Sequence, residues 1–108
     1  MNAYAHVHAG VCGFETDIKA MSDDTQNVTF QVSSTCEKIT ALALRLHVVD
    51  AYNEIGAGYE GELYKVIRES VRGCCAGCAV QVGLFKSMQV AAGLALSQEV
   101  NIVIKKDE

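Results

Sequence analysis

The sequence has few basic residues, no long apolar run and no proline. Its nine Lys and Arg are scattered, with only Lys105 and Lys106 adjacent, and the net charge is −4. Because a nucleic-acid-binding surface needs clustered basic residues, we expect no nucleic-acid partner. The most apolar stretch, residues 79–96, is interrupted by Gln81 and Lys86, so we expect no membrane span.

The first ten residues contain no basic segment of the kind that opens a secretory signal, so a cytoplasmic protein is expected. No repeat, low-complexity tract or linker interrupts the chain, which predicts a single domain over residues 1–108. No catalytic triad, phosphate-binding glycine loop or zinc-protease helix is present. The usual sequence reasons for proposing an enzyme are therefore missing.

Five cysteines are what the sequence does have. Three of them crowd into Cys74-Cys75-Ala76-Gly77-Cys78, and Cys12 and Cys36 stand alone. In the reducing cytoplasm such cysteines are more often metal ligands or redox groups than structural disulfides. We expect Cys74 to be the exception, a small apolar residue that fills the core.

Alternating apolar residues predict three strands, at residues 3–11, 14–21 and 27–33. Short turns at residues 10–13 and 22–27 separate these strands, and such short connections favour an antiparallel meander. A fourth strand is expected at residues 99–105, where Val100, Ile102 and Ile104 would face the core. Each of these strands would have one buried and one wetter face.

Helical periodicity predicts three helices between the third and fourth strands. The first opens at Ser34-Thr35-Cys36-Glu37, which resembles a capping box with Ser34 as N-cap, and ends near Val48. Residues 50–61 form a polar connection, and helices follow at residues 62–71 and 79–96. The predicted order is βββαααβ, an α+β fold with the three helices on one face of the sheet.

This topology predicts that the cysteines converge. Cys12 lies on the tip of the first hairpin, and the third strand returns toward that tip shortly before Cys36. Cys36 and Cys78 fall at helix starts, where the dipole and free N–H groups lower the pKa of a thiol. Gly77 eases a tight turn within the Cys75–Cys78 pair. We therefore expect Cys12, Cys36, Cys75 and Cys78 to bind Zn²⁺ or an iron–sulfur cluster.

The same features resemble the U-type iron–sulfur cluster scaffold proteins over residues 9–92. The resemblance rests on Ala9-Gly10-Val11-Cys12-Gly13, the acidic turn Asp23-Asp24, the strand Val28-Thr29-Phe30, Cys36 at a helix start, and Cys78 before Ala79-Val80-Gln81-Val82. The cysteine gaps of 24 (36 − 12) and 42 (78 − 36) residues are close to that pattern. It implies cluster assembly on three cysteines and transfer to another protein. The Cys-Ala-Gly-Cys-Ala-Val segment is also similar to small bacterial and archaeal proteins for which no activity is implied.

Two other interpretations remain open. In the first, Cys75 and Cys78 exchange disulfides or Cys36 carries a persulfide, with a sulfur donor or acceptor protein as partner. In the second, the chain is a non-catalytic interaction domain with inert cysteines. Its one-sided sheet would leave a bare face and open edges for a second copy, giving a homodimer.

The remaining polar groups are weaker candidates. His6 and His8 share a strand face and could reach one metal, but a solvent-facing surface explains them more simply. His47 is expected to cap a helix end. Glu15 and Asp17 lie on a wet strand face close to Cys12, where solvated carboxylates are the simplest interpretation.

Overall fold

The structure, a computed structural model, describes residues 1–107 and begins with the expected meander. Strands β1 (Asn2–His8), β2 (Glu15–Met21) and β3 (Asn27–Ser34) pair antiparallel, with Ala5 opposite Ile18 and Ile18 opposite Val32. Gly10 and Gly13 in the first turn have φ of 88° and 73°, a conformation that glycine adopts without strain. Asp24 holds the second turn by accepting hydrogen bonds from the backbone N–H groups of Gln26 and Asn27.

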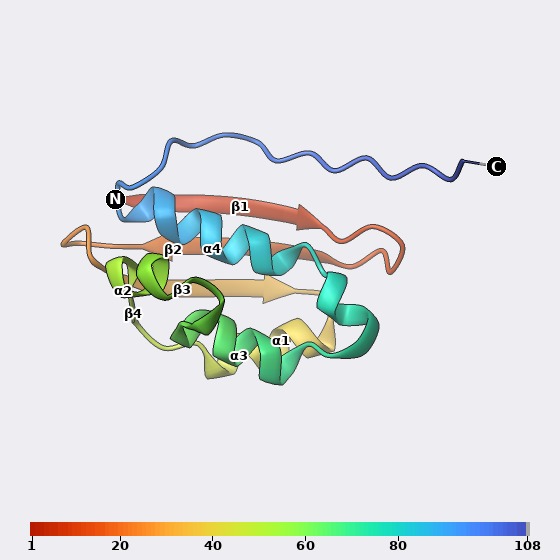
Figure 1. The fold of residues 1–108 in the computed structure, drawn as a ribbon, viewed down its shortest axis with the longest axis horizontal. Coiled ribbons are helices and arrows are strands. Elements are labelled where there is room, and N and C mark those ends of the chain that lie inside the picture. The colour runs from red at the N-terminus through yellow and green to blue at the C-terminus, as the bar shows by residue number, and fades with distance from the viewer. Residues whose placement is uncertain (108) are drawn as a thin grey trace.

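The chain then forms four α-helices, with one short strand among them. These elements are α1 (Glu37–Arg45), β4 (Val49–Asp50), α2 (Ala51–Ala57), α3 (Glu62–Ser70) and α4 (Val80–Ala91). Single 3₁₀ segments, η1 (Gly58–Glu60) and η2 (Gly73–Gly77), precede α3 and α4. The sheet order is β1-β2-β3-β4, so β1 lies at one edge of the sheet (Figure 1).

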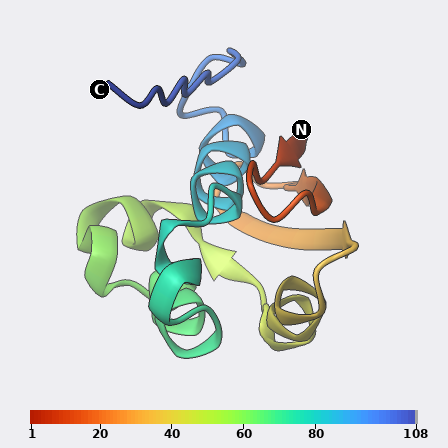
Figure 2. The same ribbon diagram turned by 90° about the vertical axis from the view of Figure 1, so that its right-hand side faces the viewer.

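The helices cover one face of the sheet, as Figure 2 shows most clearly. The α4 helix packs against β1 and β2, and α1 packs against β3 and α3. The core forms where these helices meet the inward residues of the strands, among them the fully buried Ile18, Leu42, Leu63, Leu84 and Met88. The opposite face carries exposed polar side chains, including His6, Asp17 and Gln31. The α+β class and the one-sided sheet are confirmed.

The expected fourth strand is wrong. Within the described chain, residues 99–105 pair with no strand, and Val100, Ile102 and Ile104 are exposed. The sheet gains its fourth strand at β4, where Val49 pairs with Val28 inside the region expected to end a helix and begin a polar connection. That connection also contains α2, because Asp50 caps it by accepting from the backbone N–H groups of Tyr52 and Asn53.

The expected capping box is also wrong. Cys36, in an extended conformation, is the N-cap of α1, and no side chain caps this helix. The Ser34 hydroxyl instead accepts a hydrogen bond from the Cys36 N–H and pairs with the Thr16 hydroxyl of β2, at 2.8 Å. Ser34 therefore still belongs to β3, and the helix starts later than the sequence pattern suggested. None of the helices over residues 1–107 has the length and apolar character that a bilayer crossing requires.

Candidate functional site

Three segments that are distant in sequence meet at one end of the fold. They are the β1–β2 turn, the start of α1 and the η2 segment before α4, which all lie at the right-hand end of Figure 1. These segments carry Cys12, Cys36 and the pair Cys75 and Cys78. The antiparallel meander brings the β1–β2 turn and the start of α1 to the same end of the sheet. The length of α3 and the turn of η2 bring the η2 segment to that end as well.

Short contacts hold η2 against both neighbouring helices. The Lys38 ammonium of α1 lies 3.3 Å from Cys75 Sγ, so the α1 start and η2 are in direct contact. The Gln81 side chain in the first turn of α4 donates to the Ala76 carbonyl at 2.7 Å. Within η2, the Cys78 N–H donates to the Cys75 carbonyl at 3.0 Å and fixes the pair in one tight turn. The segment is therefore a fixed part of the fold.

Cys78 is the thiol whose surroundings perturb it most clearly. Burial raises its pKa above the ordinary value, the backbone N–H of Val80 opposes that rise, and the thiols of Cys12, Cys36 and Cys75 each add to it. The lowered pKa that we expected at this helix start is therefore wrong for Cys78, because loss of solvent outweighs the backbone donor.

The cysteines differ in exposure. Cys36, Cys75 and Cys78 are half-buried and pack against the core, whereas Cys12 is exposed on the turn. Cys74 is also exposed, so the expectation that it fills the core is wrong. It sits on η2 directly after Gly73, at a point where the chain faces solvent. In residues 1–107, no set of three or more His, Cys, Asp and Glu side chains stands in metal-binding geometry.

The histidines lie apart from this group. His6 Nδ1 is 2.7 Å from Asp17 Oδ1, and its Nε2 is 3.0 Å from Glu15 Oε1, all on the bare face of the sheet. The hydrogen bonds to Asp17 and Glu15 raise the pKa of His6, so this group is an exposed ion pair when protonated. His8 Nδ1 accepts from the Gly10 N–H. His47 is exposed beyond the end of α1 and caps no helix by any side-chain bond among the described residues.

Lys38 was missed by the sequence analysis. It follows Cys36 by two positions, but its contact with Cys75 spans 37 residues of sequence, which no local pattern reveals. The Lys38 ammonium is placed to donate a hydrogen bond to the Cys75 sulfur. The cysteine end therefore combines thiols with a basic side chain.

Comparison with known proteins gives a family and no activity. The chain belongs to a family of unknown function (DUF6951), whose model matches residues 3–104. No curated protein and no solved structure matches the chain. The function must therefore be argued from the chemistry of the cysteine end.

Proposed function

We propose that this member of the family binds a thiophilic metal centre, Zn²⁺ or an iron–sulfur cluster, through Cys12, Cys36, Cys75 and Cys78. The observation that supports the proposal most directly is that the three distant segments carrying these four cysteines meet at one end of the fold (Figure 1). The convergence places four thiols from three distant segments near one another at that end. Thiolates are the preferred ligands of both kinds of centre.

The electrostatics favour a cation at this point. Burial raises the pKa of Cys78 most, and each of the other three thiols adds to that rise, so the metal-free protein resists charging all four sulfurs together. A bound cation reverses that balance, because it attracts the same charges and releases their protons. Binding would therefore pull the sulfurs closer than they stand in the free chain.

One ligand stands on a turn that can adjust. Cys12 lies between Gly10 and Gly13 in an exposed turn, whereas Cys36, Cys75 and Cys78 pack against the core. Three anchored ligands and one adjustable ligand suit a site that tightens on its metal.

A scaffold-type role would follow from the exposure of Cys12. Three half-buried thiols would hold the centre, and the exposed Cys12 would be the exchangeable ligand, open to a sulfur donor or acceptor protein. The resemblance to U-type scaffolds supports a scaffold role, although it matches Cys12, Cys36 and Cys78 and leaves Cys75 as the additional thiol. A structural or electron-carrying centre would instead need all four thiolates throughout.

The test is metal analysis of protein purified without oxygen, combined with a visible absorption spectrum. Stoichiometric zinc, or iron with sulfide and charge-transfer absorption, is expected. Serine variants of Cys12, Cys36, Cys75 and Cys78 should each lose metal, whereas Cys74→Ser, which removes an exposed thiol in the same segment, should keep it. A wild-type protein that takes up no metal after reconstitution, or a loss pattern that does not separate Cys74 from the other four, would contradict the proposal.

The Lys38 contact favours a second function, thiol exchange at the Cys75–Cys78 pair. Cys75 would attack a disulfide as the thiolate stabilised by Lys38, forming a mixed disulfide and releasing one thiolate of the substrate. Cys78 would then displace the second substrate thiol and close the Cys75–Cys78 disulfide. Lys38→Met should slow alkylation of Cys75 while leaving that of Cys74 unchanged; equal rates for Cys75 in both proteins would exclude this function.

A further inference from the structure

The C-terminal segment after α4 carries a run of exposed large apolar residues. The chain turns at Gly93 and then runs extended in the same direction as β1 (Figure 1). Its exposed large apolar residues are Leu94, Leu96, Val100, Ile102, Val103 and Ile104. Ile102 and Ile104 are 67% and 89% exposed, although β-branched residues of this kind are typical of strands.

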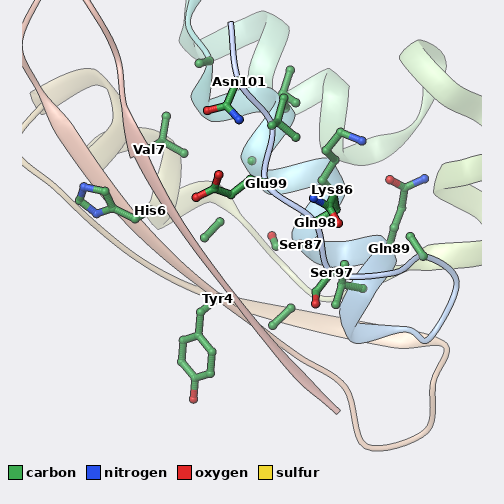
Figure 3. Close-up of a pocket in the computed structure, with 18 of the residues that line it drawn as sticks. Tyr4, His6, Val7, Lys86, Ser87, Gln89, Ser97, Gln98, Glu99 and Asn101 are labelled. Carbon is green, nitrogen blue, oxygen red and sulfur yellow. The ribbon is translucent and has the colours of Figure 1, made fainter.

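The nearest part of the fold is an open sheet edge. A hollow of about 840 Å³ separates residues 95–102 from β1 and from the flank of α4. Figure 3 shows the segment with Glu99 and Asn101 passing between β1 and Lys86 of α4, whereas the side chains of Tyr4 and His6 point to the other side of β1. Among the described residues, no backbone hydrogen bond joins the segment to β1. An unpaired strand-forming segment therefore lies next to an unpaired edge.

The sequence of the segment is complementary to itself. If two copies pair antiparallel about a two-fold axis at Ile102, Glu99 of each copy falls opposite Lys105 of the other, since both lie three residues from the axis. The same register puts Val100 opposite Ile104. Opposed residues in an antiparallel pair share a face, so the charges form an ion pair at each end of one face.

The other face of this pair is wholly apolar. Val100, Ile102 and Ile104 alternate along the segment, so two copies present six β-branched side chains together. A two-stranded ribbon alone is marginal in water, but each strand here lies beside its own β1 edge and α4 flank. If each paired segment also closed the hollow beside its own β1 edge, the sheets of the two copies would be joined through the two paired segments.

We propose that two copies of this chain form a symmetric dimer through residues 99–105, paired antiparallel about Ile102. The exposed segment of one copy pairs with the same segment of the second copy, because the charges and apolar residues of the two segments match in that register. The contact is isologous, so it closes on itself and leaves no open end for further growth. It does not depend on the cysteines or on metal.

The test is the mass of the full-length protein in solution, measured by light scattering and sedimentation over a range of concentrations. Wild type should have twice the monomer mass of 11.6 kDa. Ile102→Glu sets two carboxylates against each other on the axis and should raise the dimer dissociation constant about 100-fold. Leu44→Glu, at a residue 84% exposed on α1, is the matched control and should leave the dimer intact.

Charge reversal tests the register. Glu99→Lys and Lys105→Glu should each weaken the dimer about tenfold, because each puts like charges opposite one another at both ends of the seam. The double variant Glu99→Lys/Lys105→Glu should regain wild-type affinity. A protein that is monomeric at every concentration, or a dimer insensitive to Ile102→Glu, would overturn the proposal. Monomers whose amides at 99–105 are protected from exchange would mean that the segment closes on its own β1 edge, which would overturn it too.

Discussion

Gly83 marks a close approach of α4 to the sheet, and replacing it with alanine tests how tightly the two layers pack. A Cβ atom at this position would lie 2.8 Å from Val7 Cγ2 and 3.2 Å from Ile18 Cδ1. Val7 is β-branched and stiff, so its methyl group cannot rotate away freely. The helix would have to move away from β1 to admit the new methyl group.

Two opposing effects decide how much Gly83→Ala changes the free energy of unfolding. Alanine stabilises a helix interior by about 1 kcal/mol relative to glycine. Forcing a methyl group into a packed layer costs about 1–3 kcal/mol. The overlap with Val7 is severe, so we expect Gly83→Ala to lower the free energy of unfolding by about 1 kcal/mol net, taking the middle of these ranges.

A double-mutant cycle isolates the cause. In a Val7→Ala background the main obstacle is gone, so Gly83→Ala should there raise the free energy of unfolding by about 0.5–1 kcal/mol. Gly56→Ala in α2 is the matched control, because nothing lies within 4 Å of a Cβ there. It should be stabilising in either background.

Urea unfolding followed by circular dichroism measures the stability of each of these proteins. The reasoning would be refuted if Gly83→Ala stabilised the wild-type background as Gly56→Ala does, or if its effect had the same sign in wild type and in the Val7→Ala background. Either result would mean that α4 can move from the sheet at little cost. The position of Cys78 would then be less fixed than its place at the start of α4 suggests.

The remaining predictions concern buried capping, pH and the site itself. The buried Glu54 carboxylate accepts from the N–H groups of Glu62 and Leu63 at the start of α3, so Glu54→Ala should lower the free energy of unfolding by about 1–3 kcal/mol, as urea unfolding would measure. Backbone and side-chain bonds from Asn27 lower the pKa of Asp24 to about 2, so its stabilising effect is present above the ordinary pKa of 3.8 and disappears as pH falls from there to about 2. The urea midpoint of wild type should accordingly drop more steeply over that pH window than that of Asp24→Asn, and parallel curves would show that the turn does not matter. Adding Zn²⁺ to the metal-free protein should release protons from Cys78 and its neighbours, measurable in weakly buffered solution, and Cys78→Ser should release fewer.

Local patterns in the sequence determined the meander and most of the helices. Alternation predicted β1, β2 and β3 because one face of each strand is buried and the other is wet. Periodicity placed α3 to within one residue and found the start of α4, but it extended α4 to residue 96, five residues beyond its observed end at Ala91. The short turns then sufficed to predict that Cys12 and Cys36 share one end of the sheet.

Alternation also misled at the C-terminus, where residues 99–105 have a strand pattern and no strand partner in the single chain. A pattern shows which residues can form a strand, but pairing depends on what the rest of the fold places beside them. The fourth strand of the sheet is instead β4, which is two residues long and too short to produce any periodicity. Its place is set by the pairing of Val49 with Val28.

The same distinction between local sequence and tertiary packing applies to the cysteine site. The sequence by itself determined which residues carry thiols and that they stand at turns and helix starts. Only the tertiary structure decided that Cys74 faces solvent, that Lys38 lies against Cys75, and that burial raises the pKa of Cys78. Solvent access and contacts across 37 residues arise from how α1, η2 and α4 pack together, and no local pattern encodes that packing.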